Sequence, residues 1–493
     1  MRFSSTLLFA SALAGCASLS TPGASTSPAL HPSPDSGAIS RIIAEGTRHS
    51  HVRDDLEYLT DVIGPRLTGS PEMQRANDWT ARRFREYGMD SSWTEPWTFG
   101  IGWSRGPMTL TMLAPQHRQL IGYSWAWAPG TNGPVAGDVV FLDARTEASF
   151  HERFAGKLRG AWVMLGPAAP IANPDGPPMT AADSARLDSL RRAQFRLTEE
   201  ERRFMGRRTE LLAGEGIAGV IRDGAKEFGL LTMSGSPNAV SPVPYIVIPH
   251  GDYDQFERLL QRGEHVRLEA DIHNSFTSDT LLQRNTVAEI RGTQHPDEVV
   301  LLGAHLDSWD LGTGATDNGA GAIGVLEAAR ILKASGVRPA RSIRFVLFSG
   351  EEEGLLGSRA YARAHAAELP KYQAVLVLDN GTGRITGMAL QGRDELATLW
   401  QQLLAPVASL GPFHVRSANK GGTDHLSFLP YGVPGFNFDQ ATAGYNHTHH
   451  SQVDVFDHAI PGDLAQAATV MAATAYELAD LPALLPRNPA EQR

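Results

Sequence analysis

Apolar runs that match buried β-strands recur in the second half of the chain. They cover residues 286–290, 298–305, 342–349 and 374–379. Stretches with helical periodicity separate them, at 319–334 and 357–365. Strands that alternate with helices favour a mostly parallel or mixed sheet with helices on both faces, so the predicted fold class is α/β.

The first part of the chain has a helical pattern, whereas the middle differs in composition and in its short strand-like runs. Residues 39–89 read as two helices around the turn-rich segment 64–71, with the second helix at 77–87. The middle stretch is rich in glycine and proline and carries short strand-like runs at 138–141, 161–164, 219–221, 243–248 and 266–270, with a helix at 252–261. We therefore expect a β-rich unit inserted at 119–272 into an α/β domain.

The first residues predict export. Arg2 precedes an apolar stretch at 7–13, which is too short to span a membrane and typical of a signal peptide. The tetrad Leu13-Ala14-Gly15-Cys16 resembles the lipobox of bacterial lipoproteins, which implies a lipid anchor on Cys16, the only cysteine. The alternative is an ordinary signal peptide cut after Ala14. Either leaves an exported protein, in the cell envelope (periplasm or outer membrane) or secreted, without disulfides.

Length and charge restrict the class of protein further. A chain of 493 residues with 42% hydrophobic residues predicts two globular domains. The net charge of -10 and the lack of a basic stripe argue against a nucleic-acid partner. The basic run at 191–208 is interrupted by Glu199, Glu200 and Glu201, which predicts a solvated helix held by ion pairs.

Candidate chemistry begins at the end of the strand predicted at 298–305. His305 and Asp307 are two positions apart, so period-two geometry places them on one side. His305 can bind a metal ion while Asp307 accepts its other N–H and orients the ring. A structural histidine at a strand end is the alternative.

A second candidate ligand, Asp317, precedes the helix predicted at 319–334, where it could also be an N-cap. Gly319, Gly321 and Gly324 match the dinucleotide-binding fingerprint. We reject that interpretation because roughly a dozen residues separate these glycines from the strand, whereas the fingerprint follows its strand directly. The glycines instead predict close packing of the helix under a metal site.

More acids and imidazoles follow the later strands. Glu351, Glu352 and Glu353 come after the strand at 342–349, and Asp379 ends the strand at 374–379. Three glutamates at a helix start could simply face water and stabilise the helix dipole. Near a metal, however, one glutamate can bind the ion while its neighbour accepts a proton. The loop at 445–454 adds His447, His449 and His450.

Together these motifs resemble the M28 family of co-catalytic zinc exopeptidases with a protease-associated domain, and its carboxypeptidase Q branch most closely. The motifs are His305-x-Asp307, Asp317-Asn318-Gly319, Glu351-Glu352-x-Gly354, Asp379, and His450 four residues before Asp454. The resemblance implies that His305 and Asp379 bind one zinc ion, that Glu352 and His450 bind a second, that Asp317 bridges them, and that Glu351 is the general base. His447 is the alternative to His450 as a ligand of the second zinc ion. It also implies a cis peptide between Asp317 and Asn318.

The resemblance also implies a domain plan. We expect a signal peptide at 1–15, a tether at 16–37, a peptidase domain at 38–118 and 273–485 interrupted by a protease-associated insertion at 119–272, and a tail at 486–493. The expected activity is hydrolysis of the terminal peptide bond of dipeptides or short peptides. An aminopeptidase for longer peptides, a single-zinc transferase similar to glutaminyl cyclase and a metal-free binding module are the alternatives. The peptide terminus that is recognised and the oligomeric state stay open.

Overall fold

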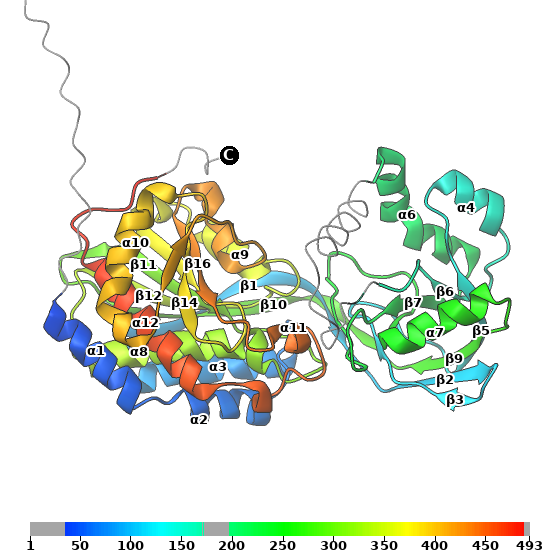
Figure 1. Cartoon of the computed structure of the whole chain (residues 1–493), viewed down its shortest axis with the longest axis horizontal. Coiled ribbons are helices and arrows are strands. Elements are labelled where there is room, and N and C mark those ends of the chain that lie inside the picture. Colours follow the sequence, from blue (N-terminus) through cyan, green and yellow to red (C-terminus); the bar gives the residue numbers. More distant parts are fainter. Residues whose placement is uncertain (1–34, 170, 172–196, 488–493) are drawn as a thin grey trace, which may run out of the picture.

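A computed structural model describes residues 35–169, 171 and 197–487 and shows two units side by side, each built on one sheet (Figure 1). The predicted signal peptide and Cys16 lie outside the described residues. The tether predicted at 16–37 is too long, because helix α1 (Ser36–Arg48) already begins inside it, with Asp35 accepting hydrogen bonds from Gly37 and Ala38 as its N-cap. Among the described helices, none has the length and apolar character needed to cross a membrane.

The sheet of the first unit is mixed. Its strand order is β1-β10-β12-β11-β13-β16-β14-β15. The central strands β12, β11, β13 and β16 run parallel. Antiparallel pairs are β1 with β10, β10 with β12 and β14 with β16, and β15 runs parallel to β14. The bounds are β1 (Ser91–Ser104), β10 (Ser275–Ile290), β11 (His295–His305), β12 (Arg341–Phe348), β13 (Tyr372–Val377), β14 (Ile385–Ala389), β15 (His414–Arg416) and β16 (Gly435–Gln440). The predicted α/β class is confirmed.

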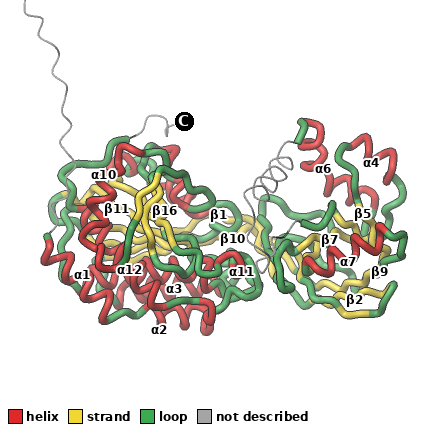
Figure 2. Tube along the Cα trace, in the orientation of Figure 1, coloured by secondary structure: helices red, strands yellow, loops and turns green. Residues whose placement is uncertain are grey.

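Both faces of this sheet are covered, and the strand sequences explain why. Val300 and Leu302 of β11 belong to a core shared with helices α1, α3, α8 and α12, whereas Val299 and Leu301 belong to a second core shared with α9. Successive side chains of a strand point to opposite faces, so a continuous apolar run requires helices on both (Figure 2). Besides α1, the α-helices of this unit are α2 (Val52–Glu57), α3 (Pro71–Glu86), α8 (Ala320–Ala334), α9 (Leu356–Ala364), α10 (Ala397–Leu404), α11 (Tyr445–Thr448) and α12 (Pro461–Ala479).

Helix α3 and strand β1 differ from the sequence-based expectation. Helix α3 begins at Pro71 rather than at residue 77, because the Ser70 hydroxyl caps it by accepting a hydrogen bond from the Met73 backbone (3.1 Å) and proline suits the first helical position. Strand β1 was missed altogether. Pro96, Gly100 and Gly102 interrupt its pattern, and pairing with β10, which includes register shifts, forms it nonetheless.

The second unit has a sheet with the order β3-β2-β9-β5-β6-β7-β8-β4. It begins at β2, before the boundary predicted at 119, because β2 pairs antiparallel with β9 at the far end of the insertion. The bounds are β2 (Met108–Ala114), β3 (Arg118–Gln119), β4 (Tyr123–Ser124), β5 (Val135–Phe141), β6 (Trp162–Met164), β7 (Gly219–Asp223), β8 (Tyr245–Ile248), β9 (Arg267–Ile272), α4 (Glu147–Phe154), α6 (Glu199–Glu215) and α7 (His250–Gln261). The part of the charged run before residue 197 lies outside the described residues.

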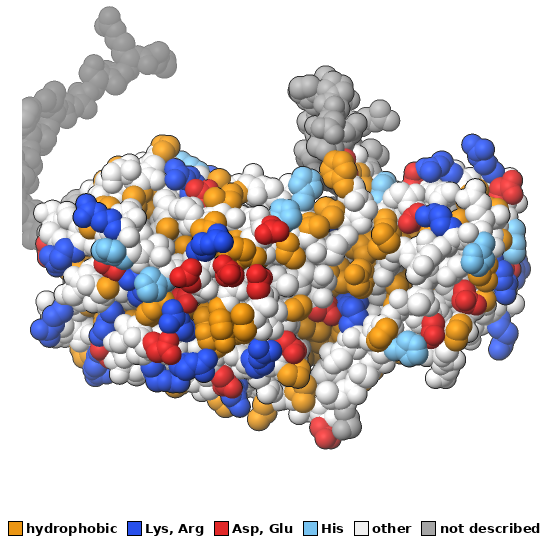
Figure 3. All heavy atoms as spheres, turned by 90° about the horizontal axis from the view of Figure 1, so that it is seen from below, with side chains coloured by type: hydrophobic (Ala, Val, Ile, Leu, Met, Phe, Trp, Pro, Cys, Tyr) orange, Lys and Arg blue, Asp and Glu red, His pale blue; other side chains and the backbone are white. Residues whose placement is uncertain are grey.

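An aromatic cluster joins the two units. Trp97 and Trp103 of β1 pack in one core with Trp127 and Met233 of the second unit and with Trp309, which follows β11. The ring centroids of Trp127 and Trp309 are 6.4 Å apart. Hydrophobic side chains also gather along the junction on the face seen in Figure 3. The loop after β11 is thus packed against the second unit.

Candidate metal centre

The carboxyl ends of three neighbouring parallel strands carry the candidate ligands. His305, the last residue of β11, is paired with Phe348 of β12, and Gly303 is paired with Val377 of β13. The three strands therefore end at one edge of the sheet. Glu351 and Glu352 follow β12 and Asp379 follows β13, so their side chains meet that of His305 in the crevice beyond this edge.

His305 is the centre of the first group of side chains. It is 1% exposed, and its Nε2 atom lies 3.3 Å from Asp317 Oδ1, 3.4 Å from Asp379 Oδ1 and 3.9 Å from Glu351 Oε2. Burial alone would lower the pKa of His305, but the nearby charges of Asp379 and Glu351 outweigh it and raise that pKa well above its usual value. A buried imidazole thus faces several carboxylates at once.

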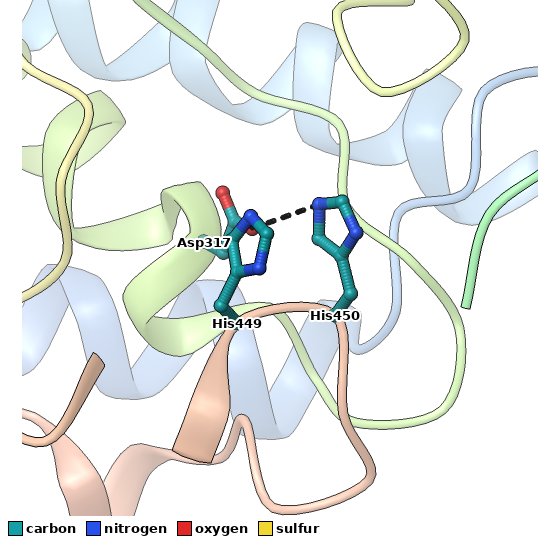
Figure 4. A group of neighbouring side chains, drawn as sticks. All are labelled: Asp317, His449 and His450. Carbon is teal, nitrogen blue, oxygen red and sulfur yellow. Dashed lines mark ion pairs between the residues drawn. The ribbon is translucent and has the colours of Figure 1, made fainter. Parts of the chain in front are cut away.

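Asp317 connects this group to a second one. Its other oxygen, Oδ2, lies 3.4 Å from Nε2 of His450 and 3.8 Å from Nε2 of His449. Glu352 Oε2 is 3.0 Å from the same nitrogen of His450. Figure 4 shows both imidazoles beside the Asp317 carboxylate, and the two rings stack at 3.7 Å between centroids.

The loop that carries Asp317 is held from both sides. The Asp317–Asn318 peptide is cis, as the resemblance implied. The Asp317 backbone N–H donates to Asp454 Oδ2 (3.1 Å), and the Asn318 side chain donates to the Leu378 carbonyl (2.9 Å). A Cβ atom on Gly321 would approach that carbonyl oxygen to 2.3 Å, so this glycine permits the close packing that the sequence predicted.

Asp307 lies in the expected place but makes different contacts. The Nδ1 atom of His305 is 3.0 Å from the backbone carbonyl of Asp307 and 3.6 Å from its carboxylate, so the carbonyl is the closer acceptor. The carboxylate instead accepts hydrogen bonds from Thr68 (3.1 Å) and from the Glu352 backbone N–H (3.2 Å). The carboxylate stays within ion-pair distance of the ring, and its orienting role remains a prediction. Through its bond to the Glu352 backbone, the Asp307 carboxylate fixes the start of the Glu351–Glu352 turn.

Glu351 differs from the other acids of the cluster in its contacts. Its closest cationic partner is His305, at 3.9 Å, and no ion pair joins it to His450 among the described residues. Burial raises the pKa of Glu351 well above its usual value, and Asp379 and Asp424 add to the effect although His305 opposes it. A carboxyl group with a raised pKa can exchange a proton near neutral pH.

The residues present fit divalent metal ions. The buried oxygens Asp317 Oδ2 and Glu352 Oε1 accept no hydrogen bond within the described part of the chain. Burial raises the pKa of Glu352 well above its usual value, and the charge of Asp317 raises it further. Buried carboxylates that repel one another need a cation, and imidazole with carboxylate is a donor set suited to zinc. His305, Asp317 and Asp379 could hold one ion, and Asp317 with His449 and His450 a second.

Sequence reasoning missed Arg66, and it did not predict that Tyr445 and His449 line the cavity of the site. The fully buried Arg66 guanidinium donates to the carbonyls of Leu306 (2.6 Å), Thr313 (2.7 Å) and Gly314 (2.7 Å), and so spans the loop between His305 and Asp317. Its only signal was its place in the turn-rich segment 64–71. The ring of His447 faces Phe228 instead, with 6.2 Å between the ring centroids. Among the described residues, His450 rather than His447 lies within ion-pair distance of the acids.

A cavity of about 450 Å³ opens onto the cluster. Its lining residues are Asp317, Glu351, Glu352, Gly354, Leu355, Asp379, Asn380, Gly421, Gly422, Tyr445, His449 and His450. This volume is in the range of pockets for small ligands. The lining contains four acids and three exposed glycines.

The family model for peptidase family M28 matches residues 285–475, from β10 to α12. Carboxypeptidase Q of Rattus norvegicus is 30% identical over 457 residues, which cover 92% of this chain and 90% of that protein. The chain belongs to peptidase family M28. It is therefore an enzyme, a metallo-exopeptidase that hydrolyses peptide bonds.

Two further relatives support the same assignment. The crystal structure of a peptidase M28 precursor from Shewanella amazonensis superposes with a TM-score of 0.75 at 27% identity and covers 92% of this chain and 99% of its own. Aminopeptidase YwaD of Bacillus subtilis is 29% identical over 216 residues, 41% of this chain and 46% of that protein. The match to the Shewanella structure extends over both units.

Proposed function

We propose that this M28 enzyme is a di-zinc exopeptidase that removes the terminal residue of dipeptides and short peptides. The observation that supports it most is the position of Asp317, whose two oxygens face two different histidines, His305 and His450, at 3.3 and 3.4 Å. One carboxylate between two sets of ligands is the arrangement that a bridged metal pair requires.

Each zinc ion has its own ligands in this proposal. His305 and Asp379 would hold one ion, Glu352 and His450 would hold the other, and Asp317 would contribute to both. Zinc bound in this way supplies a polarised carbonyl and a lower pKa for water. His449 lies next to His450 but farther from Asp317 (3.8 Å), so we assign it to the pocket wall rather than to the ligands.

The chain's own residues carry the proton transfers. Glu351 takes a proton from the attacking water and delivers it to the leaving amine, for which its raised pKa is suited. Asp307 contributes by holding the backbone of Glu352, so that the neighbouring pair of glutamates keeps its position. The buried walls around His305 exclude bulk water from the reaction.

The size of the cavity supports small substrates. A volume of about 450 Å³ accommodates a few residues of peptide. The similarity to carboxypeptidase Q over 92% of the chain supports the removal of a terminal residue. The partial similarity to aminopeptidase YwaD favours the second candidate, an aminopeptidase that acts on longer peptides.

A substrate panel separates the candidates. Protein stripped of metal and reloaded with zinc would be incubated with a free dipeptide and with its N-acetylated and C-amidated forms. A requirement for both free ends supports the dipeptidase. Cleavage that needs only the free amine supports the aminopeptidase, and cyclisation of an N-terminal glutamine without hydrolysis would support the cyclase.

We also propose that residues 1–15 direct export, that Cys16 carries a lipid anchor and that the second unit is a protease-associated insertion. The sequence of the tetrad ending in Cys16 supports the first two, and the separate sheet between β2 and β9 supports the third. Labelling with a radioactive fatty acid in a bacterial host tests the anchor. Cys16→Ser should abolish the label, and a label that persists would contradict it.

A further inference from the structure

A loop of the second unit lies against the segment that carries His450. The loop runs from β7 to residue 233, and the backbone N–H of Met233 donates to the carbonyl of His450 (3.0 Å). The backbone N–H of Leu231 donates to the side chain of Gln452 (2.9 Å). The second unit therefore forms part of the surroundings of the candidate metal centre.

Lys226 of this loop presents an ammonium group beside helix α11. Its Nζ atom donates to the Asn446 carbonyl (2.6 Å), and the side chain is half-buried. An ammonium group has three N–H donors, so this contact uses one of them. Within the part of the chain that the structure describes, no carboxylate lies within ion-pair distance of Lys226, and an ammonium group with free donors suits an anionic ligand.

Two other cations of this region, Lys420 and Arg105, already have acidic partners. Lys420, next to the glycines of the cavity lining, is 2.9 Å from Asp439, and Arg105 is 2.8 Å from Asp310. The residue to which Lys226 donates, Asn446, directly follows Tyr445, which lines the cavity. Burial lowers the pKa of Lys226 and the charge of Asp317 opposes this shift. The positive charge of Lys226 in turn adds to the effect of burial in lowering the pKa of His450.

We propose that Lys226 binds a carboxylate of the peptide substrate. This inference rests on the proposed function and names the feature that the substrate must carry. A cation from the second unit beside this cavity attracts the carboxylate and orients the peptide. The carboxylate is either the free C-terminus or an acidic side chain.

Four substrates distinguish these sources. Ala-Leu and Ala-Leu-amide differ only in the terminal carboxylate, and Ala-Glu-amide and Ala-Gln-amide differ only in a side-chain carboxylate. The first pair tests the C-terminus and the second pair tests the side chain. The quantity compared is the ratio of kcat/KM within each pair, because a general loss of activity cancels from it.

The variants are Lys226→Met, Lys226→Arg and the control Lys157→Met. Lys157 belongs to the same unit and its ammonium group also donates to a backbone carbonyl, that of Arg153 (2.8 Å). We expect Lys226→Met to lower the ratio of one pair at least tenfold, mainly through KM, while Lys226→Arg keeps most of it and Lys157→Met changes neither ratio.

Two outcomes would contradict the role of Lys226, and a third would contradict the proposed function. If Lys226→Met slows both members of each pair equally, Lys226 only links the two units and the inference is wrong. If wild-type ratios are already near one in both pairs, no carboxylate is recognised and the inference is also wrong. If the wild-type enzyme cleaves none of the four substrates while binding zinc, the proposed function itself fails.

Discussion

Asp454 accepts two hydrogen bonds from Thr316 on the same oxygen, from the backbone N–H at 2.6 Å and from the hydroxyl at 2.8 Å. Its other oxygen accepts the backbone N–H of Asp317. One buried carboxylate thereby ties the loop after His450 to the loop that presents the proposed bridging aspartate. These contacts give a structural reason for the spacing between His450 and Asp454, on which the family resemblance based the choice of His450.

Substitution of Asp454 should weaken metal binding without removing a ligand. Asp454→Ala leaves the Thr316 and Asp317 N–H groups without their acceptor, and loss of such an orienting contact typically lowers metal affinity by about 10–100-fold. A zinc titration against a competing chelator measures the change. Asp457→Ala, an exposed acid of the same loop, is the control and should bind zinc as the wild type does. Unchanged affinity in Asp454→Ala would contradict the role assigned to this carboxylate.

Arg66 should determine the stability of the loop between His305 and Asp317. Arg66→Met removes the side-chain donors to the carbonyls of Leu306, Thr313 and Gly314, of which the first and last are buried, and we expect a loss of about 3–5 kcal/mol in the free energy of unfolding. Urea denaturation of the metal-free protein measures it apart from any effect on zinc. Arg85→Met, at an exposed position of α3, should change stability by no more than about 0.5 kcal/mol. Equal losses in the two variants would show that Arg66 holds nothing specific.

Two glycines in helices should respond oppositely to alanine. Gly321→Ala places a methyl group 2.3 Å from the Leu378 carbonyl oxygen, so we expect a loss of more than about 2 kcal/mol. A methyl group on Gly206, in α6, would meet no atom within 4 Å among the described residues, so alanine there should stabilise by about 0.5–1 kcal/mol through helix propensity. Thermal unfolding of both variants checks the pair. A stable Gly321→Ala would mean that α8 is not packed closely under the site.

Asp439 gives the structure a pH-dependent stabilisation. Burial alone would raise its pKa, but hydrogen bonds from Arg416 and Lys420 outweigh burial and lower the pKa to about 2. A carboxylate with a lowered pKa stabilises the fold above its unfolded-state pKa near 4, and this stabilisation is lost as the pH falls towards 2. Asp439→Asn should therefore cost roughly 1 kcal/mol at pH 6, after allowance for solvent screening, and less at pH 3.

Urea unfolding of the wild type and Asp439→Asn at the two pH values measures this difference. Because Asp439 lies on β16 and is not one of the candidate ligands, zinc binding at pH 6 should stay the same in both proteins. A difference in stability that grows as the pH falls would have the wrong sign and would contradict the pairing with Arg416 and Lys420.

The sequence predicted the centre of the fold well because it depends on local patterns, whereas the roles of the site residues came from the resemblance to the M28 family. The apolar runs that end at His305 and before Glu351 and Asp379 lie at the middle of the sheet, where burial on both faces leaves a clear signal. The choice of His450 over His447 rested on the resemblance to the M28 family, which places its last histidine four residues before an aspartate. The apolar runs themselves need no knowledge of distant contacts.

What the sequence did not predict depends on contacts between distant segments. Strand β1 has an irregular pattern and owes its form to pairing with β10, which is far away in the chain. Arg66 stands in an ordinary turn, and its importance comes from carbonyls roughly 240 residues later. The Asp307 carboxylate was predicted to orient His305, but the backbone carbonyl of the same residue is closer. Side-chain direction at that point is a tertiary property.

The most direct test of the central claim combines zinc counting with turnover. Purified wild type and Glu351→Gln would be analysed for zinc per chain by mass spectrometry and assayed on the same free dipeptide. We predict two zinc ions per chain in both proteins and a loss of about 100-fold or more in kcat for Glu351→Gln, because the ligands remain while the base is removed. One zinc ion per chain, or full turnover by Glu351→Gln, would contradict the account.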